Sequence, residues 1–393
     1  MPVSLSLPLR EDRYIGAPVS TIFDNLLPDN TNIRKKLAER IGAQGVDAFS
    51  LLAALGRDCV GAMQFLPEDV EPAHAGVIEG HPIKDTEIAD IIKNLARSPL
   101  GLKPDEDFRI SIAGAQEKTA LLRYKNRWQK PVSATPTTHI LKPQSGELPN
   151  GVDLSNSVEN EYFCLKLTKA LGLPSANVEI ETFEGIRVLV IERFDRLFTK
   201  DKRLLRIPQE DCCQALSVPW TLKYESEGGP GVQQILKLLA GSDDAETDRR
   251  NFLKAIIAFW LLGATDGHAK NFSVFLSPGG GYRLTPIYDV VSAQPSLAAK
   301  QIRQNKMKMA MAVGDTRHYT VESVVGRHFV QSAIKAGLGR AIAFDVIEEI
   351  LEAGPTALER VATSLPKDFP GAVSEPIVEG FRSRLALLAS SLE

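Results

Sequence analysis

ATDGHAKN, residues 264–271, places an acidic residue, Asp266, five positions before an amide residue, Asn271. The preceding segment, Thr247–Gly263, has its large apolar side chains at helical spacing and predicts a buried helix. A second acidic residue, Asp289, lies downstream in LTPIYDVV. Carboxylate and amide oxygens are ligands that Mg²⁺ accepts, and a carboxylate can also orient a hydroxyl group. The stretch after the helix is therefore the first candidate for a functional site.

The spacing of Asp266 and Asn271 is that of the protein-kinase catalytic loop, HRDxxxxN. Phosphoryl transfer needs a carboxylate that orients the acceptor hydroxyl, oxygen ligands for Mg²⁺ and cations near the phosphates. Asp266 would be the first, Asn271 and Asp289 the second, and Lys270 or a distant lysine the third. The alternative is an Asp–Gly turn after a helix, with Asn271 capping the next element.

Length and composition are typical of a soluble globular protein with two or three packed units. The 393 residues are 44% hydrophobic and 24% charged, with a net charge of −3 and a pI near 6.2. Such a charge argues against autonomous binding to nucleic acid. The four cysteines form no CxxC pair and the six histidines no HExxH motif, so we predict buried thiols and no zinc site. The N-terminus lacks signal-peptide features and no apolar run reaches the ~18 residues of a membrane span, so we predict a cytoplasmic protein.

Residues 108–124, FRISIAGAQEKTALLRY, alternate in hydrophobicity on either side of a glycine turn and predict a β-hairpin. Lys118 and Thr119 end the turn and suggest that it cradles phosphate. The Walker A pattern GxxxxGK[ST] is not matched, because Glu117 stands where that pattern needs glycine. The alternative is an ordinary hairpin with surface charges.

THILKP, Thr138–Pro143, predicts a short strand with Lys142 near its end, and Asn156–Gly172 predicts a helix. The first residue of this helix and Glu159 resemble a capping box. A strand lysine followed by a helix glutamate is the order of the kinase Lys–Glu pair, which holds the lysine against the α/β-phosphates. We therefore predict that Lys142 pairs with Glu161, with Glu159 as the second candidate. The alternative is a solvated glutamate on an amphipathic helix.

Other segments complete a mixed N-terminal half and a mostly helical C-terminal half. Arg187–Ile191 predicts a buried strand, and ERFDR, which begins at Glu192, follows where a kinase hinge would hold adenine through backbone groups. The remaining predicted elements are helices at Thr31–Ile41, Phe49–Leu55, Pro208–Cys213 and Gly231–Ala240, a hairpin of Ser273–Leu276 with Tyr282–Thr285, and helices after Tyr319.

Taken together, SIAGAQEKTALL, THILKP, NEYFCLKL, ERFDR, IPQEDCCQ, KYESEGGPG, ATDGHAKNFSV and LTPIYDVVSA resemble motifs of the HipA family of bacterial toxin kinases. The similarity extends from about Pro2 to Ser391. It implies an α+β, protein-kinase-like fold of the HipA and PI3/4-kinase-like type, with a mixed α/β N-lobe and an all-helical C-lobe. We expect residues 1–100 to be the HipA N-terminal subdomain, truncated at its start. Residues 101–196 would be the N-lobe with the nucleotide loop and hinge, and residues 197–393 the C-lobe with the catalytic loop.

The resemblance also implies an activity and partners. The chain would transfer the γ-phosphate of ATP, with Mg²⁺, to a serine of an aminoacyl-tRNA synthetase, most familiarly the glutamyl enzyme. Translation and growth would then stop, a route to persistence. The usual partner is HipB, a small helix-turn-helix antitoxin whose complex with operator DNA represses transcription of the operon. No membrane partner is expected.

Site roles follow from the resemblance position by position. Asp266 would be the catalytic base, Asn271 and Asp289 would hold Mg²⁺, and Glu161 would form the structural ion pair. Ser111 matches the serine that family kinases autophosphorylate; a phosphate beside the nucleotide loop should repel ATP and eject the loop. The nucleotide-binding set also includes Ala113, Gly114, Ala115, Gln116, Glu117, Lys118, Lys142, Glu192, Arg193, Phe194, His268 and Lys270.

The chain departs from the family at its N-terminus, where longer members have additional residues. Either the start codon was placed late or a separate small HipS-like protein supplies the missing part, as in split HipBST-type systems. The known kinase of that type targets the tryptophanyl synthetase. Such kinases tend to carry a second hydroxyl two residues after the first serine. Here that position is Ala113, so Ser111 would act alone.

Two other functions are compatible with the sequence. One is a non-catalytic co-repressor that binds nucleotide and bridges antitoxin dimers on DNA. The other is a small-molecule kinase, since aminoglycoside and sugar kinases have similar loops. The serine at Ser111 weakens this last alternative.

Overall fold

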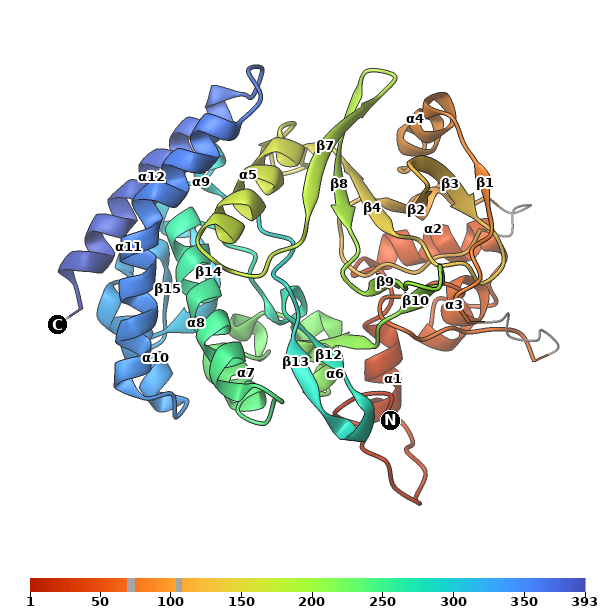
Figure 1. The fold of residues 1–393 in the computed structure, drawn as a ribbon, viewed down its shortest axis with the longest axis horizontal. Coiled ribbons are helices and arrows are strands. Elements are labelled where there is room, and N and C mark those ends of the chain that lie inside the picture. Colours follow the sequence, from red (N-terminus) through yellow and green to blue (C-terminus); the bar gives the residue numbers. More distant parts are fainter. Residues whose placement is uncertain (69–74, 104–107, 393) are drawn as a thin grey trace. The chain divides into compact units, whose positions relative to one another are not determined.

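The computed structural model describes residues 1–68, 75–103 and 108–392. Figure 1 shows helices and strands throughout the chain, which confirms the predicted α+β class. The chain forms two compact units. The first comprises Met1–Pro143, Glu179–Thr221 and Phe275–Gly280, and the second comprises Gln144–Val178, Leu222–Val274 and Gly281–Glu393. The division into 1–100, 101–196 and 197–393 stays a prediction. Among the described residues, no helix has the length and hydrophobicity that crossing a membrane requires.

The first unit is built on a six-stranded sheet with the order β1-β3-β2-β4-β8-β7. The pairs β1–β3, β2–β3, β2–β4 and β4–β8 are antiparallel. One face of the sheet packs against α4, where Ile88 and Ile92 meet Leu121, Leu141 and Val190. The strands are β1 (Gly80–Pro82), β2 (Thr119–Tyr124), β3 (Arg127–Pro131), β4 (His139–Pro143), β7 (Val178–Phe183) and β8 (Ile186–Glu192), and α4 spans Asp85–Lys93.

The hairpin predicted over residues 108–124 is wrong in its first arm. β2 pairs with β3 and β4, whereas Phe108, Ile110 and Ile112 lie outside any strand. These three side chains are buried in a core built by three helices, α1 (Ala17–Asp24), α2 (Thr31–Ile41) and α3 (Ala48–Leu55). The apolar alternation therefore records packing against helices and not pairing in a sheet.

The remaining elements of the first unit are short. They are β9 (Arg196–Phe198), β10 (Leu204–Arg206), β11 (Gln209–Asp211) and α6 (Cys212–Ala215). The helix predicted over Pro208–Cys213 is thus wrong in its first part, which is a strand. Asp211 begins α6 as its N-cap, with its side chain accepting from the Gln214 backbone N–H at 2.9 Å.

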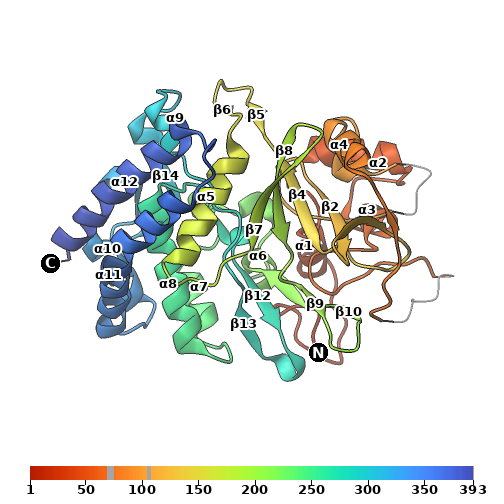
Figure 2. The same ribbon diagram turned by 45° about the horizontal axis from the view of Figure 1, so that its top comes forward.

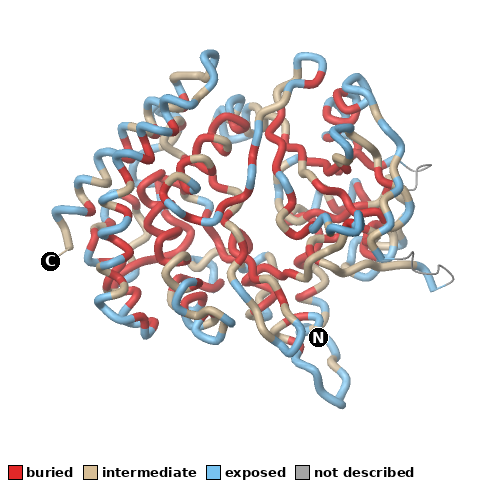
Figure 3. The backbone as a smooth tube through the Cα atoms, in the orientation of Figure 1, coloured by how far each residue is buried: buried red, intermediate tan, exposed pale blue. Residues whose placement is uncertain are grey.

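The second unit is dominated by helices (Figure 2). α8 is buried from Phe252 to Leu262, and its Trp260 indole donates to the Val321 carbonyl at 2.9 Å. Figure 3 shows buried and exposed residues alternating along α11 and α12, as expected for amphipathic surface helices. The helices are α5 (Ser157–Ala170), α7 (Val232–Leu239), α8 (Ala245–Leu262), α9 (Gln294–Ala298), α10 (Gly326–Lys335), α11 (Arg340–Ser364) and α12 (Gly371–Ser390).

The C-terminal region is not all-helical, because short strands interrupt it. β12 (Ser273–Leu276) and β13 (Tyr282–Leu284) form the predicted hairpin, closed by the Thr285 amide donating to the Ser273 carbonyl at 2.9 Å. β14 (Lys308–Val313) pairs antiparallel with β15 (His318–Thr320). β5 (Gly146–Glu147) pairs with β6 (Asp153–Leu154) before α5 begins.

The four cysteines are free and buried, as predicted. Burial raises the pKa of Cys59 to about 12, and it also raises the pKa values of Cys164 and Cys212. Thiols held protonated in the interior are poor nucleophiles and poor metal ligands. They are part of the core.

Candidate active site

Two glycines fix the position of the backbone where the loop after α8 begins. Gly263 caps the helix in the left-handed conformation, with φ 64°. Gly267, next to Asp266, lies against the ring of Phe259 from the same helix, where an added Cβ would stand 2.3 Å from a ring carbon. Only glycine allows the backbone this close to the helix, so the DG pair sets the position at which Asp266 leaves the core.

Asn271 joins the two acidic positions. Its side-chain Nδ2 donates to the Asp266 carbonyl at 2.7 Å and to the Asp289 carbonyl at 3.5 Å. Its backbone N–H donates to the His268 carbonyl at 2.9 Å. The structure therefore brings together three of the residues that the sequence singled out, with Asn271 five residues after Asp266 and 18 residues before Asp289. Because Nδ2 is committed to these carbonyls, Oδ1 is the atom of Asn271 that would ligate a metal.

The segment carrying Asp289 is fixed to the rest of the second unit. Asp289 has φ 58°, a left-handed conformation that acidic and amide residues adopt more readily than most. Ile287 forms a parallel bridge with Ser175, and the Tyr288 hydroxyl donates to the Lys270 carbonyl at 2.7 Å. Lys270 belongs to the Ala264–Asn271 loop. The Tyr288 bond is therefore a second link, besides Asn271, between the segment that carries Asp266 and the one that carries Asp289.

Asn160 is a site residue that sequence reasoning missed. It lies in α5 between Glu159 and Glu161, and it exchanges two hydrogen bonds of 2.8 Å with Ser292. The Ser292 hydroxyl in turn donates to the Leu262 carbonyl at the end of α8, at 2.6 Å. Its neighbours Glu159 and Glu161 are also polar and buried, so the sequence contains no signal that separates Asn160 from them.

The start of α5 corrects a predicted cap. The Asn156 side chain makes no capping bond. Gln144 replaces it, because its Oε1 accepts from the Val158 amide at 2.9 Å and its Nε2 donates to Glu159 at 2.7 Å. The sequence could not indicate a cap from a residue twelve positions upstream of the helix.

This bond also bears on the predicted Lys–Glu pair. Glu159 is bound by Gln144, and Glu161 is fully buried in α5 of the second unit. Lys142 is buried in β4 of the first unit, opposite Leu189 of β8. Glu161 therefore remains the better candidate partner, and its pairing with Lys142 stays a prediction.

The nucleotide loop matched by Ala113–Lys118 lies in the first unit, between buried Ile112 and β2. Gly114 has φ 103°, a value suited to glycine, and its carbonyl accepts from the Asp29 amide at 3.3 Å. Lys118 closes the loop, because its Nζ donates to the Ala113 carbonyl at 2.8 Å. A lysine and several backbone N–H groups are thus gathered at one turn.

Ser111 lies two residues before Ala113, the first residue of this loop, and is fully buried. Its hydroxyl donates to the Leu26 carbonyl at 2.8 Å, and its amide donates to the Asp58 carbonyl at 3.0 Å. A serine held in this way cannot accept a phosphate unless its segment first leaves the core. The predicted modification site is therefore closed in this conformation.

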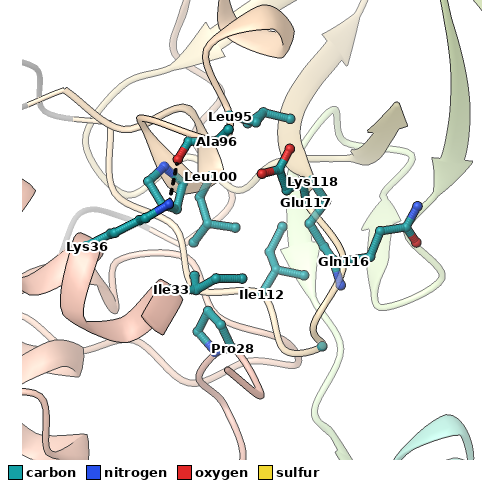
Figure 4. A pocket seen from close by; sticks show the side chains of 12 residues that line it. Pro28, Ile33, Lys36, Leu95, Ala96, Leu100, Ile112, Gln116, Glu117 and Lys118 are labelled. Atoms are coloured by element: carbon teal, nitrogen blue, oxygen red, sulfur yellow. Dashed lines mark hydrogen bonds between the residues drawn. The ribbon is translucent and has the colours of Figure 1, made fainter. Parts of the chain in front are cut away.

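One side of the nucleotide loop borders a small pocket within the first unit (Figure 4). The Lys36 ammonium at its edge donates to the Ala96 carbonyl at 3.0 Å. Its lining is Pro28, Ile33, Lys36, Leu95, Ala96, Pro99, Leu100, Ile112, Gly114, Gln116, Glu117 and Lys118. Protein interiors are normally close-packed, so the loop has fewer packed neighbours on this side.

The hinge prediction falls on a buried charge cluster. The Arg193 guanidinium pairs with Asp195 at 2.9 Å and with Asp58 at 3.3 Å, and it also donates to Thr137 at 2.9 Å. Arg196 pairs with the same two carboxylates. The side chain of Arg193 is thus occupied in the first unit. Nucleotide contacts at this turn would come from backbone groups or from its neighbours Glu192 and Phe194.

The oxygen-rich pair of Asn271 and Asp289 suits Mg²⁺, which is commonly bound by one or two carboxylates together with water and phosphate oxygens. Within residues 1–68, 75–103 and 108–392, no three His, Cys, Asp or Glu side chains are grouped as a self-sufficient metal site. Asn271 and Asp289 therefore suit a metal ion whose remaining ligands are phosphate oxygens and water. His268 and Lys270, both buried, flank Asn271 in the same loop.

Asp266 itself accepts a hydrogen bond from the hydroxyl of Tyr224. Tyr224 was not among the predicted site residues. It lies in KYESEGGPG, a stretch quoted above among the family motifs without a role for any of its residues. A tyrosine in a loop some forty residues before the catalytic loop has no spacing signal that could have indicated this contact.

Comparison with known proteins agrees with this geometry. The family model described as HipA-like C-terminal domain matches residues 110–358, more than half of the chain, and the HipA N-terminal domain model matches residues 1–66. "Putative kinase Y4mE" of Sinorhizobium fredii is 36% identical over 92% of this chain and 83% of its own length. The serine/threonine-protein kinase toxin HipA of Shewanella oneidensis is 28% identical over 93% of this chain and 82% of its own length.

A solved structure of the Shewanella oneidensis HipA, HipB and operator DNA complex contains a similar chain. It has a TM-score of 0.80 at 26% identity, covering 100% of this chain and 91% of that one. The expected protein-kinase-like fold of the HipA type is thereby confirmed. The chain belongs to the HipA family.

Proposed function

We propose that this protein is the toxin kinase of a HipBA-type toxin–antitoxin system, a cytoplasmic ATP-dependent serine/threonine kinase. The observation that carries the proposal is the Asn271 side chain, whose amide joins the backbone of Asp266 to that of Asp289. This bridge supports a site in which the Asp266 carboxylate would orient a hydroxyl, and Asn271 and Asp289 would supply oxygen ligands, as phosphoryl transfer needs from a protein.

Each residue then has a part in the reaction. Asp266 accepts a hydrogen bond from the acceptor hydroxyl and takes up its proton. Asn271 Oδ1 and the Asp289 carboxylate would hold Mg²⁺, and Lys142 and the Ala113–Lys118 loop would contact the phosphates. Bound ATP with Mg²⁺ supplies the phosphoryl group and neutralises the charge that develops during its transfer.

The acceptor we propose is a serine of an aminoacyl-tRNA synthetase, first the glutamyl enzyme. Modification of a synthetase would stop translation and growth. Phosphorylation of Ser111 would switch the kinase off, after the segment has left its buried place against Leu26. The tryptophanyl synthetase is the alternative acceptor if a HipS-like protein completes the N-terminal subdomain.

The partner we propose is a HipB-like antitoxin, with operator DNA reached mainly through it. The Shewanella oneidensis chain of 0.80 TM-score was solved with HipB and operator DNA, which supports such a partner here. The same similarity favours the second candidate function, a co-repressor that bridges antitoxin on DNA without catalysis.

The test is phosphotransfer from labelled ATP by the purified protein in a lysate of its host, with mass spectrometry of labelled bands. The control is Asp266→Ala, which should reduce labelling to background because no carboxylate would orient the acceptor, while the unfolding curve stays unchanged. Asp266 is exposed, so its truncation leaves no cavity.

Three results are informative. A single synthetase labelled only by the wild type supports the kinase and its acceptor together. A folded Asp266→Ala protein with full activity contradicts the assignment of the base. Antitoxin-dependent repression without any phosphotransfer, by protein shown to be unmodified at Ser111, supports the co-repressor.

A further inference from the structure

We propose that Tyr224 is a positioning residue for phosphotransfer: its hydroxyl holds one oxygen of the Asp266 carboxylate so that the other faces the acceptor hydroxyl. The inference rests on the proposed kinase function. It assigns a role in the reaction to the loop Lys223–Gly231, to which neither the motifs nor the relatives' names give one.

Three contacts join this loop to the Ala264–Asn271 segment, at Asp266, His268 and Ala269. The Tyr224 hydroxyl donates to Asp266 Oδ1. The Tyr224 ring meets His268 edge to face, with centroids 5.0 Å apart and an interplanar angle of 86°. The Lys223 carbonyl accepts from the Ala269 amide at 3.2 Å. Side chain, ring and backbone together fix where the hydroxyl stands.

Glycines give the loop its shape. The amides of Glu227 and Gly229 both donate to the Tyr224 carbonyl, at 3.0 and 2.9 Å. An added Cβ at Gly229 would stand 1.9 Å from the Leu222 carbonyl oxygen, and one at Gly231 would stand 2.3 Å from the Glu225 carboxyl carbon. A larger residue at Gly229 would force the backbone to move, and one at Gly231 would displace the Glu225 carboxylate. Both glycines are thus required by the fold that presents Tyr224.

Glu225, next to Tyr224, anchors the loop to β14. Its Oε2 accepts from the Ala312 amide in β14 at 2.6 Å, and its Oε1 pairs with Arg317 at 3.2 Å. Burial raises the pKa of Glu225, while the Ala312 amide and Arg317 oppose that rise. The loop is therefore attached to β14, which lies outside the Ala264–Asn271 segment. This attachment fixes the backbone next to Tyr224.

The chemical consequence concerns orientation. Asp266 is exposed, and an exposed carboxylate is free to rotate about its side-chain bonds. A donor on Oδ1 removes that freedom and leaves Oδ2 to accept from the substrate. Misplacing a reacting group by about 1 Å can cost on the order of 100-fold in rate, so the loss of this donor should be visible in kcat.

The first experiment compares wild type with Tyr224→Phe, which removes the hydroxyl and keeps the ring against His268. The assay uses full-length protein, Mg²⁺, labelled ATP and purified glutamyl-tRNA synthetase, or whichever protein the wild type labels in lysate. We expect kcat to fall about 10- to 100-fold with the KM values for ATP and acceptor unchanged. The matched control is Tyr282→Phe, which also loses one hydroxyl hydrogen bond, 2.6 Å to the Leu238 carbonyl, and should keep its kcat.

The outcomes separate the two proposals. Equal kcat values for wild type and Tyr224→Phe overturn the positioning role while the kinase stands. A higher kcat in Tyr224→Phe also overturns it, because Tyr224 would then block the acceptor. No phosphotransfer by unmodified wild type to any protein refutes the kinase function, and with it the role in catalysis.

A second measurement needs no activity. Protein labelled with ¹³C at the tyrosine Cζ gives one signal for each of its seven tyrosines, and Tyr224→Phe identifies one of them. Asp266→Ala should shift that signal and leave the Tyr282 signal in place. An unshifted Tyr224 signal would contradict the hydrogen bond itself.

Discussion

The proposed catalytic loop, Ala264–Asn271, and the proposed nucleotide segment, Ser111–Lys118, are held in different ways. In the first, Asn271 makes side-chain bonds to backbone carbonyls, Tyr288 bonds from outside to the Lys270 carbonyl, and Gly267 lies directly against Phe259. The nucleotide segment has no strand partner over Ser111 and the loop, and a pocket opens beside it.

The difference indicates which segment can move. Releasing the nucleotide segment breaks, among others, the bonds from Ser111 to Leu26 and Asp58 and from Asp29 to Gly114. Displacing the Ala264–Asn271 loop would expose buried amides and an aromatic core. A segment outside regular secondary structure and beside a pocket has fewer packed neighbours on that side, so we expect the nucleotide segment to open more readily.

The largest expected effect is at Asp58, the residue whose carbonyl holds the Ser111 amide. Burial alone would raise the pKa of its carboxyl, but Arg196, Arg193 and Arg206 hold it well below its usual range. Asp58→Ala leaves these buried arginines with one fewer carboxylate and should destabilise the protein by about 3–5 kcal/mol. Urea unfolding measures the loss.

The matched control is Asp201→Ala, which breaks an exposed pair with Arg203 in the same unit. Exposed pairs contribute only about 0–1 kcal/mol. If both variants lost the same small amount, the Asp58 cluster would not be what secures the nucleotide segment.

An intermediate effect on stability is expected at Gly267, which lies in the Ala264–Asn271 loop. Gly267→Ala forces a Cβ to within 2.3 Å of the Phe259 ring. Overpacking of this kind costs about 1–3 kcal/mol, and the displaced Asp266 should lose most of its activity. Thermal unfolding and phosphotransfer assays measure the two effects. Gly339→Ala, with nothing within 4 Å of the added Cβ, is the control that should change neither.

The smallest effect is expected at Ser111. Ser111→Ala removes one hydrogen bond to the Leu26 carbonyl, a loss of about 1 kcal/mol. Hydrogen exchange should become faster over Ile110–Lys118 and stay unchanged over Ala264–Asn271. Ser226→Ala, at an exposed serine, is the control. Equal acceleration in both segments would contradict the view that they open independently.

Sequence reasoning succeeded where a local pattern determines structure. The closeness of Asp266, Asn271 and Asp289 agrees with the motif, although their functional roles stay predictions. Apolar residues at helical spacing predicted α8, and a nearly continuous apolar run predicted β8. It failed where side chains from distant segments meet. The Gln144 cap, the Asn160–Ser292 pair and the Tyr224–Asp266 bond have no periodic pattern.

The error over Phe108–Ile112 has a different physical origin. Alternating apolar residues predict burial of one face, and that part was right, since Ile110 and Ile112 are buried. Alternation does not say whether the partner is a strand or a group of helices. The Ser111 amide finds its acceptor at Asp58, and a sequence pattern contains no information about such a bond.

The burial of Cys59 has an experimental use. Its thiol lies beside Asp58, and its carbonyl accepts from Arg193 and Arg196, so it reports on the cluster that holds Ser111. Burial raises the pKa of the Cys59 thiol to about 12, so the thiol should not react with alkylating reagents as long as this region stays closed. The rate at which iodoacetamide modifies Cys59 would therefore measure how often the nucleotide segment opens, with no added label.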